Sequence, residues 1–230
     1  MSRGRVVLTA VAVSLLLASV QLSSCGLFQR EDRDILYLAI GASDALGIGA
    51  TPLRNGYVFR IRDELEQQTR REVRLLNLAI PGGTTRDLRQ TLQLASRRDI
   101  KPDLVTIWTG ANDLINGQDS ADFEKELSAL LRELRDNTSS FIVIADIPDL
   151  TKSPFFRTQP SPVVTSSRIA AFNGVIEKQA RAFNIPIVRL SREEVTEDLV
   201  SGVDGFHPSN RGHRLIAQLF LKIISPKFPV

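Results

Sequence analysis

The residues best suited to chemistry in this chain are a serine near its start and an aspartate–histidine pair near its end. The sequence holds only two histidines, His207 and His213, and Asp204 precedes the first of them by three positions. A glycine between them and a proline after them favour a turn, in which the carboxylate accepts from one ring nitrogen and leaves the other free to take a proton. Ser43 directly follows an apolar run and can supply the hydroxyl that such a histidine activates.

Short apolar runs alternate with longer amphipathic segments along most of the chain. The runs have strand length and lack polar alternation, which suits strands covered on both faces of a parallel sheet. They are Ile35–Ile40, Val73–Leu78, Leu104–Trp108, Phe141–Ala145 and Ile187–Leu190. Apolar residues recur at helical spacing in Tyr57–Gln68, Thr85–Ala95, Asp122–Arg135 and Arg168–Phe183, and Ser209 can N-cap a last helix. The alternation predicts one doubly wound, flavodoxin-like α/β domain with a central five-stranded parallel sheet flanked by helices.

Polar groups gather where these strands are expected to end. Ser43 follows the first strand, Gly82 the second and Asn112 the third, while the turn with Asp204 and His207 comes after the fifth. Parallel α/β sheets bind ligands beyond the carboxyl ends of their strands, so these groups are expected to face one rim of the sheet.

The four blocks, in this order and at this spacing, resemble those of the SGNH hydrolases, also called the GDSL esterase/lipase family. They read GASD at 41–44, IPGGTT at 80–85, GAND at 110–113 and DGFHPS at 204–209. The resemblance implies that Ser43 is a nucleophile, that His207 is its general base and that Asp204 orients the histidine. It also implies an oxyanion hole made by the Ser43 N–H, Gly82 and the side-chain amide of Asn112, with an acyl-enzyme mechanism and no cofactor.

The first two blocks differ from the usual family pattern or leave a choice between residues. The family commonly has an aspartate just before the serine, where this chain has Ala42. Asp44, just after the serine, is expected to brace or cap the loop instead. Gly82 aligns best with the oxyanion glycine, and Gly83 is the alternative.

Several of these residues also have ordinary structural roles open to them. Ser43 can N-cap a helix after the first strand, Asn112 can belong to a plain turn, and His213 and Trp108 are expected to be structural. The glycines around Ser43 match neither dinucleotide nor P-loop spacing, which argues against nucleotide binding. No cluster of His, Asp and Glu has metal-ligand spacing, so no metal is expected.

The N-terminus resembles a secretory signal segment rather than part of the fold. Two arginines precede an uncharged apolar run, and Leu22–Cys25 resembles a bacterial lipobox whose cysteine receives lipid. An uncleaved transmembrane anchor is the alternative, since about 20 apolar residues span a bilayer. We expect residues 1–25 to be the signal segment, 26–34 a tether and 35–230 the hydrolase domain, exported and lipid-anchored at a bacterial membrane or outer surface.

Charge and composition argue against a nucleic-acid partner, and the family resemblance favours an ester substrate. Without Arg3 and Arg5 the formal charge falls from +3 to +1, and no basic stripe carries interleaved aromatic residues, so nucleic-acid binding is not expected. Cys25 is the only cysteine, which excludes an intramolecular disulfide. The expected substrate is a small-molecule, lipid or glycan ester, a range that includes lysophospholipase-like and carbohydrate O-deacetylase activities. The alternative is a non-catalytic surface lipoprotein that binds acylated or glycan ligands.

Residues 147–166 form the one long irregular stretch of the sequence. Its four prolines exclude a continuous helix, and long loops of this kind are usually functional or mobile. Phe155 and Phe156 within it can either wall an acyl pocket or pack on the edge of the domain.

Overall fold

The computed structural model describes residues 34–96 and 100–229. Within them a five-stranded sheet has the order β2-β1-β3-β4-β5, and every neighbouring pair is parallel. The strands are β1 (Ile35–Gly41), β2 (Val73–Asn77), β3 (Leu104–Trp108), β4 (Phe141–Ala145) and β5 (Ile187–Val188). This order is that of flavodoxin-like sheets and confirms the predicted doubly wound α/β fold. The expected signal segment, and the tether apart from its last residue, lie outside the described residues.

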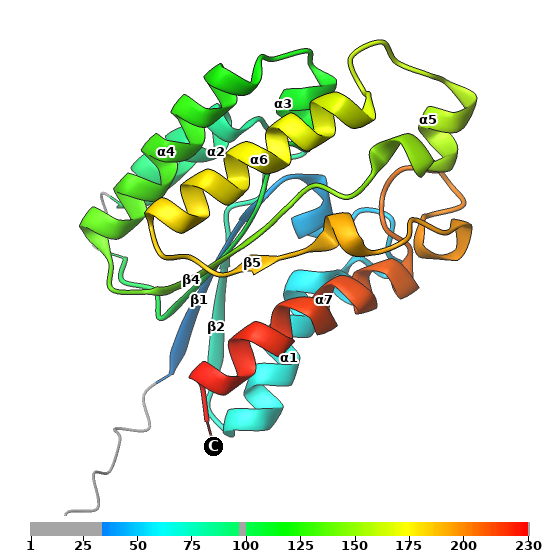
Figure 1. Ribbon diagram of the computed structural model, residues 1–230. Coiled ribbons are helices and arrows are strands. Elements are labelled where there is room, and N and C mark those ends of the chain that lie inside the picture. The colour runs from blue at the N-terminus through cyan, green and yellow to red at the C-terminus, as the bar shows by residue number, and fades with distance from the viewer. Residues whose placement is uncertain (1–33, 97–99, 230) are drawn as a thin grey trace, which may run out of the picture. The chain divides into compact units, whose positions relative to one another are not determined.

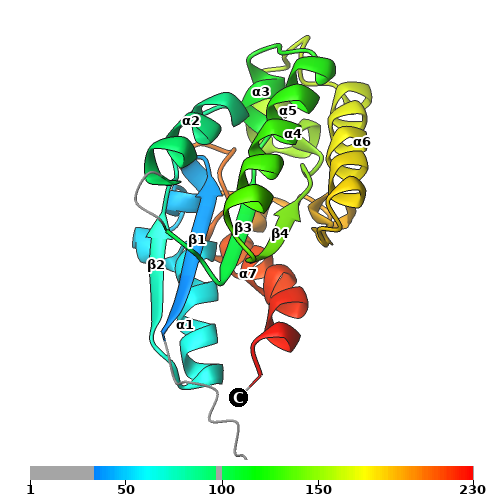
Figure 2. The ribbon, with the colours of Figure 1, turned by 90° about the vertical axis from the view of Figure 1, so that its left-hand side faces the viewer.

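Helices lie on both faces of the sheet (Figures 1 and 2). The long ones are α1 (Tyr57–Thr69), α2 (Thr85–Ser96), α4 (Ser120–Asn137), α6 (Ser166–Ala182) and α7 (Asn210–Ile224), and two short ones are α3 (Ala111–Ile115) and α5 (Pro154–Thr158). Figure 1 shows α2, α4 and α6 over one face and α1 with α7 over the other. The interior strands β1, β3 and β4 are therefore covered on both sides, which explains why they are apolar without alternation, whereas the edge strand β2 is only partly buried.

Alternate residues of β1 enter two separate cores. Leu38 and Ile40 pack with the residues of α2, α4 and α6, whereas Tyr37 and Ala39 pack with those of α1 and α7. All four side chains are at most 2% exposed. Because β1 lies between two strands and is buried on both faces, the loop that leaves its carboxyl end starts from a fixed position.

The structure departs from the sequence expectations at element ends. Strand β5 is only two residues long, because Leu190 already begins a 3₁₀ turn. Helix α6 runs from Ser166 to Ala182 with Phe183 as its C-cap, whereas the apolar spacing predicted Arg168–Phe183. Residues 147–166 are not wholly irregular, since they contain a 3₁₀ turn and the short helix α5. Among the described helices, none combines the length and apolar character needed to cross a bilayer.

Candidate active site

The candidate nucleophile lies just beyond the carboxyl end of β1, an interior strand of the sheet. Gly41, the last residue of β1, is in register with Trp108, the last residue of β3, so the loops after both strands leave the sheet at one level. Ser43 opens a 3₁₀ turn whose N-cap is Ala42, and its side chain makes no capping bond there. The helix-capping alternative for Ser43 is therefore wrong.

Ser43, His207 and Asp204 form a continuous chain of hydrogen bonds. Ser43 Oγ lies 2.9 Å from His207 Nε2, and His207 Nδ1 lies 2.6 Å from Asp204 Oδ2. An ionised carboxylate can only accept, so Nδ1 carries the ring proton and Nε2 is left to accept the proton of the serine. The fold thus brings together a hydroxyl, a base and an orienting carboxylate from opposite ends of the chain.

The turn that carries His207 is organised by Asp204. Its Oδ1 accepts from the backbone amides of Phe206 and His207 at 2.9 and 3.0 Å. Burial alone would raise the pKa of Asp204, but these amides and the His207 ring outweigh burial and lower the pKa below its usual value. Asp204 is therefore ionised at neutral pH and positions both the backbone and the ring of His207.

Two residues considered for the oxyanion hole, Gly83 and Asn112, lie beside Ser43. Asn112 and Gly83 line the same small pocket as Ser43, and Asn112 Nδ2 donates to the Gly83 carbonyl at 3.0 Å. The Gly83 amide is already engaged, because it donates to the Ile80 carbonyl at 2.9 Å. The amides of Ser43 and Gly82 have no acceptor within the described part of the chain. Although Gly83 lines the pocket, it is Gly82 that keeps a free N–H.

A buried carboxylate connects the two loops that carry these donors. Asp113, in α3, is fully buried and accepts from both the amide and the hydroxyl of Thr85 at 3.0 Å. Burial raises the pKa of Asp113, and the hydrogen bonds from Thr85 oppose that rise. Because Thr85 begins α2, the pair fixes the loop after β2 against the loop after β3. Sequence reasoning missed this role, whose signal was an aspartate directly after Asn112.

Asp44 does not brace the nucleophile loop, contrary to the expectation from sequence. Its side chain makes no hydrogen bond to another described residue. Burial raises its pKa from 3.8 to about 6, and the nearby His207 partly offsets that rise. The side chain instead lines two pockets that meet beside Ser43.

His213 has the structural role expected of it. The ring is fully buried in α7, where Nδ1 accepts from the Tyr57 amide at 3.2 Å and Nε2 donates to the Ile48 carbonyl at 3.0 Å. Burial lowers its pKa to about 4, so the ring is neutral at physiological pH. His213 therefore ties α7 to the start of α1 and to the loop that follows Ser43.

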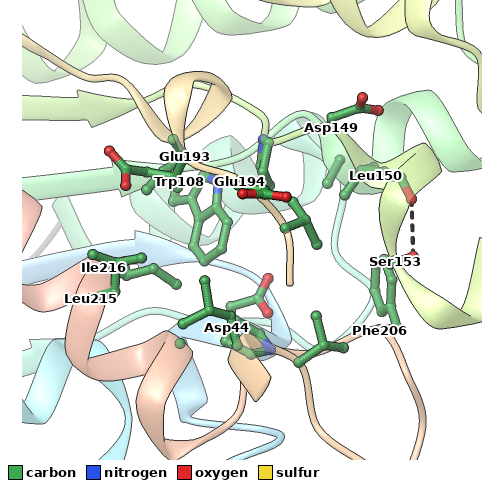
Figure 3. Close-up of a pocket in the computed structure, with 18 residues that line it drawn as sticks. Asp44, Trp108, Asp149, Leu150, Ser153, Glu193, Glu194, Phe206, Leu215 and Ile216 are labelled. Atoms are coloured by element: carbon green, nitrogen blue, oxygen red, sulfur yellow. Dashed lines mark hydrogen bonds between the residues drawn. The ribbon is translucent and has the colours of Figure 1, made fainter. Parts of the chain in front are cut away.

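Two adjoining pockets open beside the nucleophile. The smaller one contains Ser43, and the larger one has a volume of about 750 Å³ including its open mouth. They share Asp44, Trp108, Ala111 and Phe206, and Figure 3 shows the larger pocket. Trp108 packs in the core with residues of α1 and α7, as expected, and is 8% exposed. It also lines both pockets, and its indole N–H has no partner among the described residues. Buried donors without a partner are uncommon and call for a functional explanation.

Phe155 and Phe156 pack on the edge of the domain instead of lining either pocket. Their ring centres lie 6.1 and 5.7 Å from that of Phe206. Phe206 in turn lies edge-on to His207 with ring centres 5.0 Å apart. Phe206, which sequence reasoning did not single out, therefore lines the site beside His207 together with Trp108, and the two other phenylalanine rings support it.

The side chains gathered here are those of nucleophilic acyl transfer: a hydroxyl, a base held by a carboxylate, and nearby N–H donors. Within residues 34–96 and 100–229, no group of three or more His, Cys, Asp and Glu side chains is placed to hold a metal ion.

Comparison with known families agrees with this arrangement. The family model of GDSL-like Lipase/Acylhydrolase proteins matches residues 39–215, a span that includes all the candidate site residues. The chain therefore belongs to the GDSL-like lipase/acylhydrolase family. Its sequence has no significant match among curated proteins.

Solved structures share the fold at low sequence identity. A lipase/acylhydrolase from Enterococcus faecalis is 21% identical with a TM-score of 0.66, and the match covers 84% of this chain and 96% of that one. The psychrotrophic esterase EstA from Pseudoalteromonas sp., in a structure inhibited by monoethylphosphonate, is 18% identical with a TM-score of 0.66, covering 83% and 97%. An acetyl xylan esterase, AlAXEase, is 18% identical with a TM-score of 0.66, covering 83% and 100%.

Proposed function

We propose that this chain is a serine esterase that hydrolyses carboxylic ester bonds through an acyl-enzyme. The observation that carries the proposal is the hydrogen-bonded chain from Ser43 through His207 to Asp204, with distances of 2.9 and 2.6 Å. Membership of a lipase and acylhydrolase family supports an enzyme that acts on esters.

In the proposed reaction His207 Nε2 takes the proton of Ser43 as Oγ attacks the ester carbonyl carbon. Collapse of the tetrahedral intermediate breaks the bond to the alcohol oxygen, which receives that proton from His207. A water molecule, deprotonated by the same ring nitrogen, then hydrolyses the acyl-enzyme and restores Ser43.

The oxyanion of the intermediate is proposed to bind the amides of Ser43 and Gly82 and the side-chain amide of Asn112. The two backbone amides lack acceptors among the described residues, which supports their availability. Donors held in place before the reaction stabilise developing charge without reorganisation, and losing one typically lowers kcat about 10²–10³-fold.

The proposed substrates are esters of small molecules, lipids or glycans. The names of two structural neighbours, a lipase/acylhydrolase and an acetyl xylan esterase, support this range. We also propose that the protein is exported and held at a bacterial membrane by lipid on Cys25, with residues 26–34 as a tether to the hydrolase domain. The lipobox-like sequence at Leu22–Cys25 supports this anchoring.

Kinetics with p-nitrophenyl acetate and longer p-nitrophenyl esters tests the reaction. Ser43→Ala and His207→Ala should each lower kcat at least about 10³-fold. The hydroxyl and the imidazole act together in the proposed reaction, so the loss of either one disables both. An alkyl phosphonate should label Ser43, as read by mass spectrometry. Ser139→Ala, at an exposed serine beyond α4, is the matched control and should keep wild-type kinetics. Folded protein that turns over no acyl ester and takes no label at Ser43 would favour the non-catalytic binding lipoprotein.

A further inference from the structure

The larger pocket beside Ser43 has a distinctive lining. Its walls come from the end of β3, the loops after β4 and β5 and the first turns of α7, and most of them are apolar. The charged residues that line it are all acidic: Asp44, Asp149, Glu193 and Glu194. No lysine, arginine or histidine is among its described lining residues. An apolar pocket that contains carboxylates but no cationic side chain discriminates between ligands by their charge.

Asp44 is the carboxylate that matters most, because it lines this pocket and the one that holds Ser43. It is half-buried and has no hydrogen bond to another described residue, whereas Asp149 accepts from the amide and hydroxyl of Thr151. Figure 3 shows Asp44 on one side of the pocket and Glu193 and Glu194 on the opposite side, with the Trp108 ring between them.

An apolar chain in this pocket would strip water from Asp44 and leave its charge with only its own backbone amide as a hydrogen-bond donor, which is costly. A hydroxyl would supply one hydrogen bond but no opposite charge. An ammonium group supplies both, and the face of an indole ring such as Trp108 attracts cations. The carboxylate, the aromatic ring and a lining without lysine, arginine or histidine therefore favour an ammonium group as the occupant.

The pocket also adjoins the turn that carries His207, the residue that must protonate the leaving alcohol. His207 has to protonate the alcohol oxygen, so the alcohol part of an ester lies next to the His207 ring. Phe206 and Pro208, which flank His207 in the sequence, both line this pocket. The alcohol part is thus directed toward Asp44 and Trp108.

We propose that this pocket selects esters whose alcohol part carries an ammonium group, with Asp44 and Trp108 as the residues that bind it. The inference rests on the proposed esterase function and names its substrate class. In the reaction the bond from Ser43 Oγ to the acyl carbon forms, and the bond to the alcohol oxygen breaks. The serine proton passes through His207 to that oxygen, so an amino alcohol leaves with its ammonium group unchanged.

Two isosteric esters test the proposal on the full chain purified in mild detergent. Acetylcholine carries a quaternary ammonium group, and 3,3-dimethylbutyl acetate has carbon in place of that nitrogen. Wild-type protein should prefer the cation at least tenfold in kcat/KM, and Asp44→Asn should reduce that ratio at least fivefold. A ratio taken within one variant cancels general effects of the change on catalysis. Asp136→Asn, at the exposed end of α4, is the matched control and should leave the ratio unchanged.

The pocket proposal and the esterase proposal fail in different ways. Protein that hydrolyses p-nitrophenyl acetate through Ser43 but shows a ratio near one, or the same ratio in Asp44→Asn, overturns the pocket proposal alone. Protein that is folded and hydrolyses no ester overturns the esterase proposal. Should Asp44→Asn not fold, choline should inhibit wild-type hydrolysis of p-nitrophenyl acetate at least tenfold more strongly than 3,3-dimethylbutanol. Equal inhibition by the two alcohols would contradict the proposal.

Discussion

At the scale of single residues, the site depends on one carboxylate that does two jobs. Asp204 holds the His207 ring through Oδ2 and the backbone of the turn through Oδ1, which accepts from the amides of Phe206 and His207. An asparagine at this position can keep the backbone bonds but cannot hold the ring in the same tautomer. The two jobs can therefore be separated by experiment.

Asp204→Asn should lower kcat on p-nitrophenyl acetate by about 10²–10⁴-fold, the upper figure being the effect in a serine protease triad. We expect less than that upper limit, because the short turn still holds the ring near Ser43. KM should change little, since the turn stays in place. Steady-state kinetics beside the Asp136→Asn control measures both constants, and a loss below tenfold would contradict the orienting role.

Asp44 should lower stability at neutral pH, because burial favours its protonated form. Its pKa in the fold, about 6, lies above its ordinary value of 3.8. The folded state thus binds the proton more tightly, and stability is lost as pH rises from about 4 through 6. Asp44→Asn should therefore be more stable than wild type by about 1 kcal/mol at pH 7.5, a figure reduced because the side chain is only half-buried.

Urea unfolding at pH 4.5 and pH 7.5 checks this prediction. The gain in unfolding free energy from Asp44→Asn should be small at pH 4.5, where Asp44 is mostly protonated in the folded protein. It should reach its full size at pH 7.5. Glu64→Gln, an exposed change on α1, should shift stability by less than about 0.5 kcal/mol at either pH. A gain from Asp44→Asn that does not grow with pH would argue against a buried charge.

At the scale of elements, the site requires close packing between the loop after Ser43 and the turn that carries His207. Gly49 has a φ of 93°, and a Cβ there would lie 2.3 Å from the Pro208 carbonyl oxygen and 2.8 Å from His207 Cβ. Only glycine allows this approach without displacing the backbone of the turn. The distance between nucleophile and base is thus set by packing between two loops.

Gly49→Ala should push the His207 turn away from Ser43, lowering kcat at least about tenfold and also lowering Tm, because both the φ and the space are unsuitable for a side chain. Gly174→Ala is the matched control, since Gly174 lies exposed within α6 with open space around it. That change should raise stability by about 0.5–1 kcal/mol through helix propensity and leave kcat unaltered. Wild-type kcat in Gly49→Ala would show that the approach of the two loops does not set the catalytic distance.

At the scale of the whole molecule, the proposed anchor lies before the described domain. If Cys25 carries lipid, the esterase domain works close to a membrane surface. One acyl chain gives only marginal membrane binding, and two or more hold a protein stably.

Cys25→Ser should abolish both the incorporation of labelled palmitate and the partition of the protein with bacterial membranes. Ser24→Ala keeps a small residue before the cysteine and should retain both, because such processing sites accept small residues. Labelling and membrane fractionation of intact cells measure the outcome. Wild-type localisation of Cys25→Ser would point to the uncleaved anchor instead.

The sequence by itself determined the order of strands and helices along the chain and predicted the candidate reacting groups of the site. Strands buried on both faces must be apolar throughout, and helices with one buried face must repeat at helical spacing, so both leave a local pattern. The reacting groups could also be read, because Ser43, Asn112 and His207 follow predicted strands and have residue types suited to one chemistry. The turn that carries Asp204 and His207 could be predicted as well, because a glycine lies between them and a proline follows.

Only the tertiary structure decided the roles of residues whose partners lie far away in sequence. Asp44 proved to line a pocket rather than to brace a loop, Asp113 to hold Thr85 across two loops, and Phe206 to line the site beside His207. Each role depends on side chains from segments that follow different strands and meet only in the folded domain. No local pattern records such contacts, because burial and charge at these positions are properties of the packed domain and not of the neighbouring residues.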